Sequence, residues 1–339
     1  MADSSALAPL PPIEQVRPGL WSIPVPIPDN PLRYVLVYAF DTDRGPVIVD
    51  AGWNTDDAWD TLCHGLKVAG FDVADVQGVL VTHIHPDHYG LAGRVREASG
   101  AWVALHPADA ELIGDRYEHM DDLLTRMGAW LRRAGAPLDQ TANLQMASMA
   151  VRRFVDAIHP DVLMEDGDQA EVPGWDVVAI WTPGHSPGHL CFYERNRRLM
   201  LSGDHVLPRI TPNISFHPQA QADPLGDFLA ALEKVAAFPT DEVLPAHEHR
   251  FVGLPSRVRQ LIEHHEHRFE EVVESIRAGH TTAWEITSRM VWSRPWERIE
   301  GFMRRAALGE CLAHLRALEA RGVVAVTEGE PAHFGLAEG

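Results

Sequence analysis

VTHIHPDHYG, residues 81–90, carries three histidines and one aspartate within six positions, directly after an apolar run. Side chains at alternate positions leaving a strand point to the same side, so His83 and His85 are predicted to share a face. Asp87 and His88 follow where the chain turns towards a helix. Neutral imidazole and carboxylate groups are ligands that zinc and related metals use. The stretch therefore predicts a metal site at the end of a buried strand.

Three later stretches also place a ligand-type side chain directly after an apolar strand pattern. They are WTPGHSPGH (181–189) with His185, LMLSGDHV (199–206) with Asp204 and EVLPAHEH (242–249) with His247. In open α/β layers, sites gather beyond the carboxyl ends of strands, so these side chains are expected to meet the first group. His249 is the alternative late ligand, and His247 is favoured because it stands directly at the strand end.

The four ligand-type side chains of residues 81–90 are too many for a single ion that has to remain reactive. They can be divided between two ions, with His83 and His85 on one and Asp87 and His88 on the other. Each ion then needs further ligands from the later stretches, so the sequence predicts a two-metal centre.

The surroundings of the motif alternate between strand and helix patterns. RYVLVYAFDTDRGPVIVDAGW (33–53) predicts strands over 34–40 and 46–50, and a helix is predicted over 55–70. Residues 107–159 form a helical insertion far longer than the usual connection of about 4–6 residues. The alternation indicates an α/β layered fold. The predicted organisation is an extended lead-in over 1–18, a catalytic domain over 19–254 and a small domain over 255–339 with three helices and two short strands.

In their order, these motifs resemble the metallo-β-lactamase-fold hydrolase superfamily over about residues 20–250. The shared pattern is HxHxDH, a lone Gly-His, a Gly-Asp, a late Pro-x-His and an early Asp-x-Gly within VIVDAGW (47–53). The resemblance implies a four-layer αββα sandwich. TPGHSPGH together with THIHPDHYG looks closest to the glyoxalase II-like thioesterase branch. The last 85 or so residues resemble the winged-helix tail of lactamase-like hydrolases, including an endoribonuclease group. Those relatives often carry Pro-Gly-His-Gly where this chain has Pro245-Ala246-His247-Glu248, which keeps the ligand.

Carried onto this sequence, the resemblance implies a ligand set for two zinc ions. Asp50 would orient a ligand, and His189 would support the site without binding metal. Trp53, His205 and Asn213 are candidates for the pocket wall, together with the insertion. The implied ligands are His83, His85 and His185 for one zinc, Asp87, His88 and His247 for the other, and Asp204 as the bridge.

The implied chemistry is hydrolysis by a hydroxide that bridges the two metals, with Asp87 orienting that hydroxide as well as binding metal. The expected substrate is a small ester-like molecule, a thioester or another activated acyl compound. The alternatives are a phosphodiesterase or ribonuclease, a β-lactamase or lactonase, and an iron-containing redox member of the fold. Iron and manganese suit the same ligands as zinc.

The composition indicates which classes of binding partner are expected. A formal net charge of −19 without a Lys/Arg run disfavours nucleic acid as a partner. The near balance of Arg and Glu in 255–339 favours packing or homodimer formation by the small domain over DNA binding. Three widely spaced cysteines form neither a disulfide framework nor a CxxC site, and the sequence shows no signal peptide or membrane span. A cytoplasmic enzyme with a small-molecule substrate is therefore expected.

Overall fold

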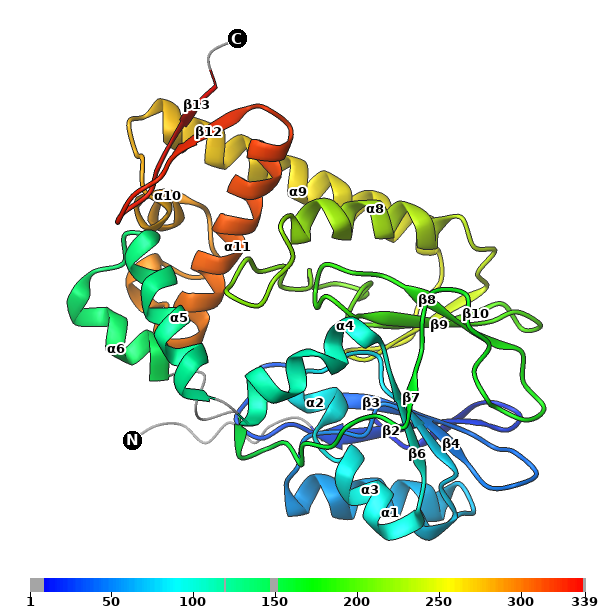
Figure 1. Ribbon diagram of the computed structural model, residues 1–339. Coiled ribbons are helices and arrows are strands. Elements are labelled where there is room, and N and C mark those ends of the chain that lie inside the picture. Colours follow the sequence, from blue (N-terminus) through cyan, green and yellow to red (C-terminus); the bar gives the residue numbers. More distant parts are fainter. Residues whose placement is uncertain (1–8, 119, 147–151, 338–339) are drawn as a thin grey trace.

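The protein folds into two facing β-sheets with helices on both outer faces, as the computed structural model shows for residues 9–118, 120–146 and 152–337 (Figure 1). The first sheet runs in the order β1 (Glu14–Arg17), β2 (Leu20–Pro26), β3 (Tyr34–Phe40), β4 (Val47–Val49), β5 (Gly78–Leu80), β6 (Trp102–Leu105) and β7 (Val162–Leu163). The second runs in the order β11 (Glu242–Pro245), β10 (Leu199–Gly203), β9 (Leu190–Glu194) and β8 (Val177–Trp181). The strands predicted over 34–40 and 46–50 are therefore present as β3 and β4.

The two-residue period of the strands explains why both faces of the first sheet are apolar. In β3, Val35 and Val37 pack towards the outer helices, whereas Leu36 and Phe40 belong to the core between the two sheets. Helices α1 (Asp56–Val68) and α3 (Ala92–Ser99) lie beneath the first sheet in Figure 1, and α8 (Pro224–Ala236) and α9 (Leu254–Arg277) lie above the second. The resulting four layers match the predicted αββα sandwich.

The parallel part of the first sheet positions the site. β4, β5 and β6 are paired in parallel, and so are β10 and β11 in the second sheet. Their carboxyl ends therefore meet at shared edges. At the other end of the sheet, β1 pairs antiparallel with β2, so the predicted lead-in of 1–18 ends in a strand.

The predicted insertion lies between β6 and β7, and residues 119 and 147–151 within it are outside the described part. Its helices α5 (Met120–Arg133) and α6 (Leu138–Met146) lie beside α11 (Gly301–Ala320) in Figure 1, whereas Ile113 and Tyr117 near its start belong to the hydrophobic cluster of the first sheet. Arg304 of α11 reaches the insertion by donating a hydrogen bond of 2.8 Å to Gln140. The described elements are α4 (Pro107–Ala110), the π-helical turn η2 (Gly114–Glu118), α5 (Met120–Arg133) and α6 (Leu138–Met146).

The C-terminal region contains the predicted helices and strand pair. Its Leu308, Cys311 and Leu315 share one hydrophobic cluster with Ile180 of β8 and Leu232 of α8. The region is thus packed into the same core as the second sheet, and the domain boundary at 254 and the winged-helix assignment stay predictions. Within the described ranges, no helix combines the length and the apolar character that a bilayer crossing needs. After α9 come α10 (Ala283–Arg289), η3 (Trp296–Arg298), α11 (Gly301–Ala320), β12 (Val324–Thr327) and β13 (His333–Leu336).

Candidate metal centre

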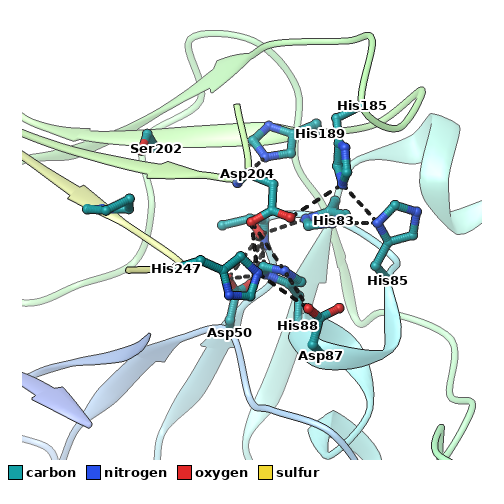
Figure 2. A network of polar contacts seen from close by, with 12 residues as sticks. Asp50, His83, His85, Asp87, His88, His185, His189, Ser202, Asp204 and His247 are labelled. Atoms are coloured by element: carbon teal, nitrogen blue, oxygen red, sulfur yellow. Dashed lines mark hydrogen bonds and ion pairs between the residues drawn. The ribbon is translucent and has the colours of Figure 1, made fainter. Parts of the chain in front are cut away.

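All the predicted ligands lie together in loops, and in one short helix, that follow strands of both sheets (Figure 2). The ligand loop after β5 leads into a short helix, α2 (Pro86–Tyr89), with His85 as its N-cap. Pro86 occupies the first helical position, where its fixed φ suits the helix start. This turn places Asp87 and His88 in the first turn of α2. Asp50 follows β4, His185 follows β8 and Asp204 follows β10, and one residue separates His247 from the end of β11.

One group of candidate ligands consists of three histidines. His83 Nε2 and His185 Nε2 each lie 2.9 Å from Nδ1 of His85. The Nδ1 of His185 donates to the carbonyl of Asn213 at 3.0 Å, which leaves a lone pair on its Nε2. Burial lowers the pKa of all three imidazoles and keeps them neutral, the form that binds metal.

The other group combines two histidines with two carboxylates. His247 Nε2 lies 3.4 Å from Asp87 Oδ2 and 3.2 Å from Asp204 Oδ1. His88 Nε2 lies 3.6 Å from each of the same two carboxylates. Asp204 also approaches His185, at 3.5 Å, so it stands between the two groups, as a bridging ligand would. Figure 2 shows these side chains pointing towards one small volume.

Hydrogen bonds behind the ligands fix which nitrogen of each ring faces that volume. His88 Nδ1 donates to Asp50 Oδ2 at 2.7 Å, and His247 Nδ1 donates to the carbonyl of Tyr34 at 2.8 Å. Asp50 has a left-handed φ of 63° and also accepts from the backbone N–H and the hydroxyl of Thr82. Since both Nδ1 atoms donate, Nε2 is the nitrogen of His88 and of His247 that offers a lone pair to a metal when the ring is neutral.

These residues fit a metal ion because several of their buried polar atoms have no hydrogen-bond partner among the described residues. Within the described residues, His88 Nε2, His247 Nε2 and Asp204 Oδ1 are buried without a hydrogen-bond partner. Burial would lower the pKa of His247, but the Asp204 and Asp87 carboxylates raise it to about 10. Burial would likewise raise the pKa of Asp204, but His247 and His88 hold it below its usual value. Buried carboxylates and imidazole lone pairs converging in this way need a cation, and a metal can replace the protons. The sets whose ligand atoms lie within 4.8 Å of one another are His83–His85–His185, His83–His88–Asp204 and Asp87–His88–His247.

His189 lies beside the centre with both ring nitrogens engaged. The backbone N–H of Asp204 donates to its Nε2 at 3.1 Å, so its Nδ1 donates to Thr182 Oγ1 at 2.8 Å. A Cβ at Gly203, where φ is 51°, would lie 2.6 Å from that Nε2. Glycine therefore lets the backbone bring Asp204 against His189, which holds the carboxylate in place.

Asp109 is a supporting residue that the sequence analysis missed. Its buried carboxylate accepts from the backbone N–H of Ile84 at 2.9 Å, from Ser186 Oγ at 2.8 Å and from the N–H of Gly188 at 2.7 Å. It thereby ties the HxHxDH loop to the loop that carries His185. No local motif marks this role, because the partners lie 25 to 79 positions away along the chain.

A cavity of about 470 Å³ opens onto the centre, and His85, Asp87, His185 and Asp204 contribute to its wall. Trp53 and Asn213 line it. His205 does not reach the wall: it is fully buried and packs against Phe228 and His189. That prediction failed because the residue after Asp204 turns back into the core of the second sheet.

The C-terminal region also lines this cavity, which the sequence analysis did not anticipate. Phe302 and Arg305 of α11 line it together with Arg116, Met127 and Trp130 of the insertion. Packing was the role expected of this region. Only the fold brings residues 116 and 305 together, and the sequence carries no signal for it.

Comparisons with known proteins agree with this geometry. A family model described as the Metallo-beta-lactamase superfamily matches residues 30–247. A solved structure of a metallo-beta-lactamase family protein from Thermus thermophilus superposes with a TM-score of 0.81 at 28% identity, covering 95% of this chain and 100% of that one.

Two curated proteins are similar in sequence. The probable metallo-hydrolase YqjP of Bacillus subtilis is 24% identical over 305 residues, which is 88% of this chain and 92% of that protein. The human acyl-coenzyme A thioesterase MBLAC2 is 27% identical over 176 residues, 51% of this chain and 56% of the human protein.

Proposed function

The chain belongs to the metallo-beta-lactamase superfamily, and on that premise we propose that it is a metal-dependent hydrolase of small ester-like substrates, thioesters first among them. The observation that carries the proposal is the convergence of unpaired imidazole nitrogens and buried carboxylates beside the cavity. We propose two zinc ions as the resident metals. His83, His85 and His185 would hold one and Asp87, His88 and His247 the other, with Asp204 between them.

Two bound metal ions would supply a hydroxide at neutral pH and polarise the bond under attack. The chain's own residues prepare that chemistry. Asp87 reaches the cavity wall, where its carboxylate can orient the attacking water as well as bind metal. Asp50 fixes the ring of His88, and the backbone of Tyr34 fixes that of His247. These supports hold the ligand set in one geometry before substrate arrives.

The shape and lining of the cavity support a small acyl substrate. Its volume suits a small molecule rather than a polymer. Apolar side chains supply much of the wall and would contact an acyl group. The similarity to an acyl-coenzyme A thioesterase supports a thioester, and a place in the glyoxalase II-like branch is proposed with it. The apolar lining residues include Leu32, Trp53, Leu123, Met127, Trp130 and Phe302.

A cytoplasmic location is proposed with this function. Cys63, Cys191 and Cys311 are all free thiols, which suits a reducing compartment.

The proposal is tested with four substrates: an acyl thioester, an aryl ester, an aryl phosphodiester and a cephalosporin. We expect thioester turnover that falls by more than about a hundredfold in His83→Ala, because a direct ligand is lost. His267→Ala, which removes an exposed histidine of α9, is the matched control and should keep full activity. Cleavage of the phosphodiester alone would favour the phosphodiesterase alternative, and cleavage of the cephalosporin alone would favour a β-lactamase. Cleavage of none of the four would overturn the hydrolase.

A further inference from the structure

We propose that the cavity contains an anion-binding subsite built by Arg116 and Arg305, which selects substrates carrying a carboxylate or phosphate away from the bond that is cleaved. The selection of substrates rests on the proposed hydrolase function, whereas the binding of an anion does not. The shared chemistry is an anionic group with several acceptor oxygens, which guanidinium groups bind with paired hydrogen bonds.

Arg116 supplies the first charge. It belongs to the π-helical turn η2, next to Tyr117, and it lines the cavity with His85 and Asp87. Within the described residues, no carboxylate lies at ion-pair distance from Arg116, although Asp115 beside it pairs with Arg126 at 2.5 Å. A guanidinium that faces a cavity without a carboxylate partner is available for an anionic ligand.

Arg305 supplies the second charge from a different part of the chain. It stands in the second turn of α11, where its Nη1 donates to the carbonyl of Leu144 at 3.3 Å and its guanidinium lies 5.1 Å from the ring centre of Phe302. These contacts hold the side chain in the cavity wall. The insertion and the C-terminal region therefore each contribute one arginine to the same space.

The two arginines are close enough to affect each other. Burial lowers the pKa of Arg305 to about 10, and the nearby Arg116 adds to that lowering. Burial, Arg116 and Arg305 together lower the pKa of His217, another wall residue, to about 3, so this histidine stays neutral. Like charges held together in a partly buried wall repel one another, and a bound anion would relieve that repulsion.

Outside the metal centre, the charged lining residues of the cavity are mostly arginines. The acidic lining residues are Asp29, Asp87 and Asp204, and the last two belong to the metal centre. Asp29 is exposed, and Arg152 adds a third, exposed arginine to the wall. In addition, Nε1 of Trp130 is buried without an acceptor among the described residues, which adds an unused donor to the same wall. The lining thus combines metal-centre residues, apolar side chains and arginines, which fits an acyl compound that also carries an anionic group.

Two matched pairs of thioesters test the subsite. S-acetylpantetheine and S-acetyl-4′-phosphopantetheine differ by a phosphate, and S-acetyl-1-propanethiol and S-acetyl-3-mercaptopropanoate differ by a carboxylate. We expect kcat/KM to favour the anionic member of at least one pair by about tenfold or more, and Arg116→Gln and Arg305→Gln to remove that preference. Arg116→Lys should keep part of it. Arg44→Gln, which changes an exposed arginine paired with Glu171, is the control.

Binding without turnover separates the subsite from the hydrolase. The S-propyl thioethers of the same four thiols lack the scissile bond. Their binding can be followed by isothermal titration calorimetry. Tighter binding of an anionic thioether that depends on Arg116 supports the subsite even if no thioester is cleaved, in which case only the proposed function fails. Equal binding of charged and neutral thioethers, unchanged by either arginine variant, would overturn the subsite even if all four thioesters are cleaved.

Discussion

Asp50 shows at the scale of one residue how the site depends on groups that do not touch the metal volume directly. Its carboxylate accepts from the N–H and hydroxyl of Thr82 and from His88 Nδ1, so it joins the loop after β4 to the loop after β5. All of these donors are buried. An amide at this position would offer one acceptor oxygen fewer and would place an N–H₂ group against a donor.

Asp50→Asn is therefore expected to weaken metal binding by about 10- to 100-fold, mainly in the group that contains His88. Zinc retained per chain after dialysis against graded chelator concentrations measures the effect. Asp43→Asn, the same change at an exposed position after β3, should behave like the unsubstituted chain. Equal zinc retention in the two variants would show that Asp50 does not position His88.

The ligands themselves could be predicted from the sequence because each stands in a short motif beside a strand. The structure brings together His83, His85, Asp87 and His88 with His185, Asp204 and His247 as expected, although their metal roles stay predictions. Asp109, Arg116 and Arg305 could not be predicted in the same way. Their partners are distant in sequence, and only the packing of the insertion and α11 brings them to the site.

At the scale of elements, α9 and α11 meet through a buried pair of histidines. His265 Nδ1 lies 3.1 Å from His314 Nε2, and His314 Nδ1 donates to the carbonyl of Glu310 at 2.7 Å. Burial lowers the pKa of His265 to about 2 and that of His314 to about 3. Both are therefore neutral in the folded state, whereas in the unfolded chain they take up protons near pH 6.5. Protonation of these histidines in the unfolded chain therefore lowers the free energy of unfolding. The free energy of unfolding is unaffected by them above about pH 6.5 and decreases as pH falls from there towards about 3.

His265→Leu should consequently flatten the dependence of stability on pH. Below about pH 6, each such histidine lowers the free energy of unfolding by up to about 1.4 kcal/mol for each pH unit. The free energy of unfolding in urea at pH 7.5 and 5.5 measures this, with His267→Leu on the exposed side of α9 as the control. The ligand histidines are the same in both variants, so their contribution cancels. Identical pH slopes would mean that His265 is protonated in the folded state.

At the scale of the whole molecule, the second sheet and the C-terminal helices form one core. α9 and α11 both pack against α8, and side chains from all three share a cluster with β8 and β10. The sequence pattern of three helices and two strands correctly placed these elements but could not show what they pack against. Hydrophobic periodicity identifies an apolar face, whereas its partner depends on the tertiary fold.

A chain ending at residue 254 is expected to lack a cooperative thermal transition, because α8 and the second sheet would lose the apolar side chains of α9 and α11 that pack against them. Circular dichroism on heating, with sedimentation to detect aggregation, provides the measurement. A chain ending at residue 323, which loses only β12 and β13, should retain a transition. A soluble monomer with a cooperative transition from the shorter chain would show instead that residues 19–254 form an independent domain.

The metal content of the purified chain tests the central claim most directly. Prepared without added metal, the chain should contain about two zinc ions, His185→Ala and His247→Ala about one each, and His267→Ala the same two as the unsubstituted chain. Thioester hydrolysis should fall with the zinc lost. Zinc content that is negligible, or that does not change in the ligand variants, would contradict a two-metal centre. Bound iron without hydrolysis of any ester would contradict the hydrolase and favour the redox alternative.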